Sequence, residues 1–211
     1  RKLMETPLSQ IAKFINKTVY KLSDEELADA DFQGRAAFES WYAKATVKQA
    51  ANRINRHNAN RIITSKQDIT ELDKEAVRQD FIKGAKAELA MLGKLSHLGP
   101  IDYNDNQETQ STNYWDIASL GCKIDVKVFD KHDEFDRTTV SFNSFSKIAN
   151  PYGATSDVAV LICMIINNTV KPMMLISRDA LRKTLRVSKH EEAYSEFSLK
   201  LVSELLHQDP F

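Results

Sequence analysis

The sequence contains no run of the roughly 18 to 20 consecutive apolar residues that a membrane-spanning helix needs. Its most apolar stretch, Val158 to Ile166, has the length of a β-strand. Hydrophobic residues make up 42% and charged residues 27% of the 211 residues, proportions that are typical of a soluble globular protein. We therefore expect no membrane partner and one substantial core, with room for a smaller appended subdomain.

Cysteine is scarce, with only Cys122 and Cys163 present. Both lie in apolar, β-like runs and neither has a metal-ligand spacing. This pattern favours buried free thiols over disulfides and indicates an intracellular, reducing (cytoplasmic) location. The chain opens at Arg1 without an initiator methionine or an apolar leader, so we expect a trimmed start.

The sequence also lacks internal repeats, low-complexity tracts, a phosphate-binding glycine loop, a GxSxG elbow and zinc-ligand spacing. These absences exclude several enzyme classes. The formal net charge is zero. A nucleic-acid-binding protein with this balance must concentrate its basic residues in one region.

What the sequence does contain is a hairpin signature between Asn113 and Asp130. Two β-like runs, Tyr114 to Ala118 and Cys122 to Phe129, flank the two-residue turn Leu120-Gly121. If Ser119 faces Cys122, opposed residue numbers sum to 241, and the hairpin then places Asp116 opposite Asp125 and Tyr114 opposite Lys127. Because side chains alternate along a strand, Asp125 and Lys127 share one face, and the alternate residues from Cys122 to Val128 take the other.

Two carboxylates and an ammonium are thus gathered on one surface. Opposed carboxylates repel each other by a few tenths to about 1 kcal/mol on an exposed sheet, and by more where they are buried. A divalent cation compensates this repulsion, and oxygen-rich sites suit Mg²⁺ or Mn²⁺. The alternative is a solvated hairpin with an ion pair between Asp125 and Lys127.

A long helix is expected from Asp68 to Leu95, beginning near Ser65 or Asp68. Its expected inward stripe is Ile69, Leu72, Ala76, Phe81, Ala85, Leu89, Leu92 and Leu95. Glu88 falls beside Ala85 and Leu92 at spacings of three and four, so we expect it to face inward, where a carboxylate needs a partner or a metal. The alternative is a Glu88 that is solvated or paired with a nearby lysine. Gly84 and Gly93 are expected to mark close packing against the sheet.

Asp116, followed after eight residues by Asp125-Val126-Lys127 in an apolar strand, resembles the motif of the PD-(D/E)xK nuclease superfamily. The resemblance spans roughly Asp68 to Leu185 in its order of elements but is carried by four residues, with Glu88 at the position of the helical glutamate. It departs from the family pattern at Trp115, which replaces the motif proline, and in its second acid, which is Asp instead of Glu. The resemblance implies that Asp116, Asp125 and Glu88 bind Mg²⁺, with Mn²⁺ able to substitute, and that Lys127 joins them as a catalytic residue.

Basic residues are concentrated between Trp41 and Gln67, a segment with six Lys or Arg and no Asp or Glu. On a helical wheel, small apolar residues (Ala43, Val47, Ala50, Ala51 and Ile54) share one side, and basic and amide residues take most of the other. Such a face suits backbone phosphates and base edges. The residues we expect to contact nucleic acid are Lys44, Lys48, Asn52, Arg53, Arg56 and Arg61. The alternative is a solvated face paired with acids from elsewhere.

The expected fold is α/β, with a mixed central sheet flanked by helices (a restriction-endonuclease-like core) and a helical N-terminal region. Three parts are expected: residues 1–66, helical and DNA-contacting; 67–187, the α/β core; and 188–211, a C-terminal helix that packs on the core or at a dimer contact. Further expected elements are helices over Pro7 to Tyr20, Asp24 to Ala30, Asn143 to Ala149 and Ser177 to Leu185, and strands over Ile101 to Tyr103, Thr138 to Phe142, Asp157 to Ile166 and, at an edge, Pro172 to Ile176.

These expectations combine into a Mg²⁺-dependent endonuclease acting on DNA, most simply double-stranded DNA. Cutting both strands would require either a homodimer or sequential nicks. Two alternatives stay open: a non-catalytic nucleic-acid-binding module or assembly subunit of the same fold, and an unrelated α/β protein in which Asp116 and Asp125 lie apart.

Overall fold

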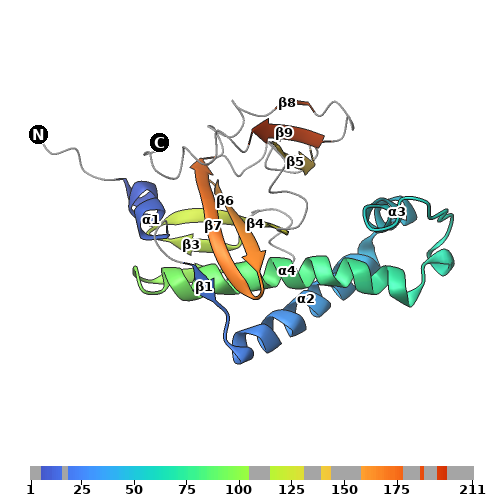
Figure 1. The fold of residues 1–211 in the computed structure, drawn as a ribbon, viewed down its shortest axis with the longest axis horizontal. Coiled ribbons are helices and arrows are strands. Elements are labelled where there is room, and N and C mark those ends of the chain that lie inside the picture. The colour runs from blue at the N-terminus through green and yellow to red at the C-terminus, as the bar shows by residue number, and fades with distance from the viewer. Residues whose placement is uncertain are drawn as a thin grey trace, which may run out of the picture.

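The structure is a computed structural model, and it describes residues 6–15, 19–104, 115–130, 139–143, 158–177, 186–187 and 194–198. Its architecture is mixed α/β, with helices packed beside a curled six-stranded sheet (Figure 1). This agrees with the α/β fold class expected from the sequence. No helix in the described part of the chain is long and apolar enough to cross a membrane.

Four α-helices occur in these ranges: α1 (Pro7–Ile15), α2 (Asp24–Lys44), α3 (Val47–Asn55) and α4 (Glu71–Leu95), with a 3₁₀ turn at Lys66–Asp68 before α4. Reciprocal capping boxes start the last three α-helices: Ser23 with Glu26, Thr46 with Gln49, and Thr70 with Asp73. In each box the hydroxyl accepts from the third backbone N–H, and the third side chain accepts from the cap N–H. The box at Thr46 therefore separates α3 from α2.

The larger sheet has the strand order β1-β7-β6-β4-β3-β2. Its strands are β1 (Tyr20–Lys21), β2 (Ile101–Tyr103), β3 (Ile117–Ser119), β4 (Cys122–Asp130), β6 (Val158–Ile166) and β7 (Thr169–Ser177). β4 and β6 run parallel, and every other neighbouring pair is antiparallel. A smaller sheet has the order β5 (Thr139–Asn143), β9 (Tyr194–Ser198) and β8 (Arg186–Val187). β4 is thus an interior strand of the larger sheet.

The β3–β4 hairpin has the predicted turn and register. Leu120 and Gly121 have φ angles of 49° and 78°, the two consecutive positive values of a type I′ turn, whose twist matches that of the flanking strands. Ser119 pairs with Cys122, and Ile117 pairs with Ile124. The expected sum of 241 is confirmed over the residues of β3.

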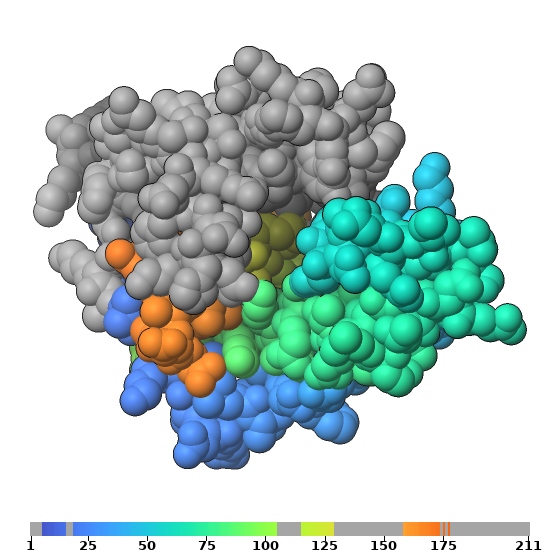
Figure 2. Space-filling model, turned by 45° about the vertical axis from the view of Figure 1, so that its right-hand side comes forward, coloured from blue at the N-terminus to red at the C-terminus, as the bar shows by residue number. Residues whose placement is uncertain are grey.

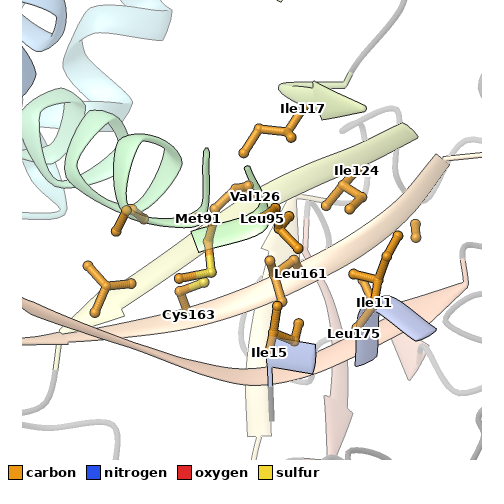
Figure 3. Close-up of a cluster of buried hydrophobic side chains, with 14 of the residues drawn as sticks. Ile11, Ile15, Met91, Leu95, Ile117, Ile124, Val126, Leu161, Cys163 and Leu175 are labelled. Carbon is orange, nitrogen blue, oxygen red and sulfur yellow. The ribbon is translucent and has the colours of Figure 1, made fainter. Parts of the chain in front are cut away.

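The main core lies between the larger sheet, α1 and the C-terminal half of α4 (Figure 3). Its fully buried members include Ile11, Met91, Ile124 and Leu161. The N-terminal region expected at residues 1–66 contributes to this core through α1, and β1 pairs with β7. Residues 1–66 therefore share both a core and a sheet with residues 67–187.

A buried ammonium joins α1 to this core. Lys94 is 6% exposed, and its Nζ donates a hydrogen bond of 3.0 Å to the carbonyl oxygen of Ile15 in the last turn of α1. Burial lowers the pKa of Lys94. A cation at a helix C-terminus is favoured by the helix dipole, so this contact fixes the end of α1 against α4.

The N-terminal half of α4 packs against α2 and α3 in a second cluster that contains Phe38, Ile54 and Val77. Gly34 of α2 lies at the closest approach: a Cβ atom there would be 2.5 Å from the Cα atom of Ile82 in α4. Bidentate hydrogen bonds from Arg35 to Glu75, at 3.0 and 3.1 Å, join the same two helices. α4 therefore connects the sheet at one end to the α2–α3 pair at the other (Figure 1).

Replacing Gly34 with alanine is expected to destabilise the protein by about 1 to 3 kcal/mol, because the added methyl group forces α2 away from α4. Gly84→Ala is the matched control. A Cβ atom at Gly84 meets nothing within 4 Å, so this change should be neutral or stabilise by up to about 1 kcal/mol through helix propensity. Urea unfolding of both variants measures the difference. Equal stability of Gly34→Ala and wild type would contradict the close α2–α4 contact.

Several sequence-based expectations for the helices were wrong. The helix expected to end at Ala30 continues to Lys44, and the helix expected to reach Tyr20 ends at Ile15. Leu72, placed on the inward stripe, is 82% exposed. Gly93 does pack closely, against the Tyr20 side chain of β1, whereas Gly84 does not. A helix that packs on different elements at its two ends does not bury one continuous stripe of side chains.

Other differences concern the strands. β7 begins at Thr169, before the expected edge strand, and β1 pairs with Thr169 and Val170. Within the described residues, 172–176 pair only with β6, which agrees with the edge position expected there. Pro172 lies beside the shift in the β6–β7 register, a bulge of the kind that tolerates proline. A C-terminal helix was expected over residues 188–211, but the described part of this segment is a strand, Tyr194–Ser198. The expected helices over residues 144–149 and 178–185, and the Tyr114 side chain, lie outside the described residues.

Candidate active site

β4 presents two of the predicted site residues on the face opposite the main core. Ile124 and Val126 are buried in that core, and Asp125 and Lys127 alternate with them as predicted. The Asp125 carboxylate is nevertheless 5% exposed. Its Oδ1 accepts a hydrogen bond of 2.9 Å from Lys127 Nζ, whose side chain is 44% exposed. The strand therefore places a buried carboxylate beside a lysine whose side chain is partly exposed to solvent.

Asp116 lies directly before β3, and its contacts differ from the predicted pairing. The β3–β4 ladder ends at Ile117 and Ile124. Beyond it the Asp116 N–H donates to the Ile124 carbonyl at 2.8 Å, and Asp116 Oδ2 accepts from the Val126 N–H at 2.8 Å. The strand expected from Tyr114 thus begins only at Ile117, because the Asp116 side chain takes the place of a backbone acceptor. These bonds fix the Asp116 carboxylate beside β4.

Glu88 reaches the same region from α4. Its Oε2 accepts a hydrogen bond of 3.1 Å from the hydroxyl of Tyr103 in β2. The same hydroxyl lies 3.1 Å from Gln33 Oε1 in α2. The Glu88 side chain is half-buried, so it points toward the sheet as the sequence predicted, and its partner is a tyrosine instead of Lys86 or Lys94. Lys86 bonds Asn168, and Lys94 bonds Ile15.

The charges of these four residues act on one another. Burial raises the pKa of Glu88 to about 7, against the lowering effects of Tyr103 and Lys127, and the charge of Asp125 raises it further. Burial raises the pKa of Asp116 well above its usual value, and the charges of Glu88 and Asp125 add to this. Lost hydration acts to lower the pKa of Lys127, but the surrounding carboxylates outweigh it and raise that pKa. The site is an electrostatically coupled group with excess negative charge.

The pKa of Glu88 predicts a pH dependence of stability. An acid whose pKa is raised in the folded state binds its proton more tightly there than in the unfolded chain. The folded state is then favoured at low pH and loses stability as the pH rises from about 4.5 to about 7. Thermal melts of the metal-free protein should show a melting temperature that falls between pH 5 and pH 7.5. Glu88→Gln should flatten this slope, and an unchanged slope in that variant would contradict the assignment.

The donor set can be tested against a divalent metal. Within the described ranges no group of three or more His, Cys, Asp or Glu side chains is arranged to hold a metal ion. Mg²⁺ usually takes only one or two carboxylates and fills its shell with water and phosphate oxygens. Asp116 and Asp125 supply such a pair, and their mutual repulsion is the condition that a cation relieves. The residues present therefore fit Mg²⁺ or Mn²⁺ better than a metal that needs an all-protein cage.

The predicted nucleic-acid-binding residues divide into two groups. Lys44, Lys48, Asn52 and Arg56 are exposed on the surface of α2 and α3. Arg53 and Arg61 make contacts within the fold. The Arg53 guanidinium stacks 4.8 Å from the Trp41 ring centroid and 4.4 Å from that of Phe81, and Arg61 pairs with Asp73 at 2.9 Å. The buried side of α3 is formed by Ala50 and Ile54 as expected, whereas Ala43 is exposed.

α4 contacts α3 through Phe81 and carries Glu88 of the candidate site. Phe81, on which Arg53 stacks, precedes Glu88 by two helical turns, which places them on the same face about 10 Å apart along the axis. Figure 1 shows α3 and the sheet on one side of α4, with α2 on the other. In Figure 2 a part of the surface of residues 115–130 appears above α4 and beside the α3 region, on the same face of the molecule.

Comparison with protein-family models, with curated proteins and with solved structures finds no match to this chain.

The sequence predicted that Glu88, Asp116, Asp125 and Lys127 belong to one site, but it did not predict the contacts of Tyr103 and Gln33 with Glu88. The expected strand at Ile101 to Tyr103 is present as β2. Its pairing with β3, in which Tyr103 lies opposite Ile117, has no signal in the sequence, because no short turn sets the register.

Proposed function

We propose that this protein is a Mg²⁺-dependent endonuclease that hydrolyses phosphodiester bonds in DNA, with a site of the PD-(D/E)xK type. One observation carries the proposal: the 2.8 Å hydrogen bond from the Val126 N–H to Asp116 Oδ2 places the Asp116 carboxylate against the strand that bears Asp125 and Lys127, whose side chains bond at 2.9 Å. The charges of Asp125 and Lys127 also act on the pKa values of Asp116 and of Glu88 in α4. A hydrated hairpin with a simple Asp125–Lys127 ion pair gives no reason for Asp116 and Glu88 to be drawn into the same group.

Each residue has a defined task in this proposal. Asp116 and Asp125 hold the metal. Glu88, which is not arranged with them as a third ligand in this structure, adjusts the charge around the metal shell. Bound Mg²⁺ would supply charge stabilisation at the scissile phosphate and lower the pKa of an attacking water. Lys127 orients that water and stabilises negative charge as it develops on the phosphate oxygens. Its half-exposed side chain, anchored by Asp125 at 2.9 Å, suits this position between the protein and an incoming strand.

The basic surface of α3 supports DNA as the substrate. Lys44, Lys48 and Arg56 are exposed in a segment without acidic residues. We therefore place contacts with the DNA backbone along this surface.

The proposal is tested by incubating the full chain with supercoiled plasmid, with and without Mg²⁺. Nicked or linear DNA should form only with the metal, and EDTA should stop the reaction. Mg²⁺ binding and DNA binding without any cleavage would instead identify a non-catalytic nucleic-acid-binding module of the same fold. The absence of both Mg²⁺ and DNA binding would overturn the proposal and its alternative together.

Removing two exposed lysines from the basic surface should weaken DNA binding mainly through counterion release. The double variant Lys44→Ala, Lys48→Ala should reduce the slope of log K against log salt by about 1.8, since each lost phosphate contact contributes about 0.9. Fluorescence anisotropy over a salt series measures this slope. The charge-matched control is Lys21→Ala, Lys171→Ala, which removes two exposed lysines from β1 and β7. Equal slopes in both double variants would show that α3 does not contact the backbone.

A further inference from the structure

The Glu88 carboxylate is held by a second layer of side chains that the proposed chemistry does not itself use. The Tyr103 hydroxyl lies 3.1 Å from Glu88 Oε2 and 3.1 Å from Gln33 Oε1. The three residues come from α4, β2 and α2. Each side chain is half-buried, so this contact lies at the edge of the core, where a side chain has little freedom to move.

The number of protons that these groups can donate determines which group is the donor in each hydrogen bond. A tyrosine hydroxyl carries one proton, so it can donate to only one of its two neighbours. An ionised Glu88 can only accept, and it therefore takes the Tyr103 proton. Gln33 then serves as the donor, with its amide turned so that an N–H points at the tyrosine oxygen, an assignment that exchanges the amide oxygen and nitrogen. With this assignment the hydrogen bonds run in the order Gln33, Tyr103, Glu88.

We propose that Tyr103 and Gln33 are positioning residues that hold Glu88 toward the metal position beside Asp116 and Asp125. This inference rests on the proposed function. Hydrogen bonds to a ligating carboxylate or histidine fix its orientation, and their loss typically costs about 10- to 100-fold in metal affinity or activity. A chain of aligned hydrogen bonds also polarises its members in the same sense.

The fold explains why a tyrosine on β2 can do this. β2 pairs with β3 so that Tyr103 lies opposite Ile117, the residue after Asp116. The next residue, Asn104, donates its N–H to the Asp116 carbonyl at 2.9 Å, and its side-chain amide donates to the Trp115 carbonyl at 3.0 Å. One short segment of β2 thus contacts both the backbone of the Asp116 loop and the carboxylate of Glu88. β2 sets the relative position of the two acids.

The test is Tyr103→Phe, which removes only the hydroxyl. Mg²⁺ affinity, measured by calorimetry without DNA, should fall about 10-fold, within the range usual for outer-shell partners. Gln33→Leu should cause a smaller loss in the same direction. The control is Tyr20→Phe, because Tyr20 donates to Glu26 at 2.9 Å in an equivalent tyrosine–glutamate pair on β1 and α2. Tyr20→Phe should leave Mg²⁺ affinity unchanged.

A double-mutant cycle separates positioning from general loss of structure. If Tyr103 acts through Glu88, the variant Glu88→Gln, Tyr103→Phe should bind Mg²⁺ no more weakly than Glu88→Gln alone. Additive losses, or a Tyr103→Phe protein that binds Mg²⁺ as wild type does, would overturn the inference while leaving the nuclease proposal intact. A wild-type protein that binds no Mg²⁺ would instead overturn the proposed function. Should Tyr103→Phe fail to fold, Gln33→Leu measured in the same cycle decides the question.

Discussion

Lys127→Ala is expected to reduce plasmid cleavage by about 10³-fold or more, which is the size of effect seen when a group that transfers a proton or stabilises transition-state charge is lost. The Lys127 ammonium is fixed 2.9 Å from Asp125 Oδ1, and its side chain is 44% exposed. In the proposed mechanism it is the positive group that meets the incoming phosphate. The rate is measured as the initial velocity of supercoiled DNA loss at saturating Mg²⁺.

Mg²⁺ and DNA binding should be nearly unchanged in this variant, because the proposed mechanism does not use Lys127 as a metal ligand and Lys127 lies outside the basic surface of α3. Lys123→Ala is the matched control, since Lys123 precedes Lys127 by four residues on the same strand and face. It should cleave at close to the wild-type rate. A Lys127→Ala protein that retains a tenth or more of the wild-type rate would remove Lys127 from the mechanism.

Asp116→Asn and Asp125→Asn are each expected to abolish detectable cleavage and to remove the rise in melting temperature that Mg²⁺ causes in the wild type. Both substitutions keep the side-chain shape and remove the charge that attracts the cation. Asp116→Asn should in addition raise the melting temperature of the metal-free protein. Its raised pKa reflects burial and the charges of Glu88 and Asp125, and an asparagine oxygen can still accept the hydrogen bond from the Val126 N–H.

A substitution that raises the melting temperature and abolishes activity is characteristic of a site whose charges serve function at a cost in stability. Asp102→Asn is the control, because Asp102 is an exposed aspartate on the neighbouring strand β2. It should change neither the melting temperature nor the Mg²⁺ response. Cleavage that survives in Asp125→Asn would defeat the assignment of the metal site, and an Asp116→Asn protein with a lower metal-free melting temperature would show that Asp116 serves the fold instead.

The hairpin was predictable because its determinants are local. A two-residue turn with glycine sets the register, and alternation then assigns each side chain of β4 to a face. The placement of Asp125 and Lys127 together, and of Ile124 and Val126 in the core, followed from these two rules. The position of Asp116 followed only approximately, because its carboxylate bonds the Val126 N–H and ends the strand pairing early.

The helices were harder to predict because their surroundings change along their length. α4 packs on the sheet at its C-terminal half and on α2 and α3 at its N-terminal half. One apolar stripe cannot describe both contacts, and so Leu72 is exposed while Lys94 is buried. Likewise Arg53 looked like a phosphate ligand in a segment without acids, but it stacks on Trp41 and Phe81. Contacts with aromatic residues that are distant in the sequence produce no periodic pattern from which they could be predicted.

The order in which the larger sheet pairs its strands has a consequence for the synthesis of the protein on the ribosome. Lys123 at the start of β4 pairs with Val158, and Tyr20 of β1 pairs with Val170. The strand that bears Asp125 and Lys127 therefore keeps one unpaired edge until β6 has emerged, and β1 has no partner until β7 follows. Such distant pairings form late because the intervening chain must first be closed into a loop. A nascent chain would therefore pair both edges of the strand that bears Asp125 and Lys127 only after β6 has been translated.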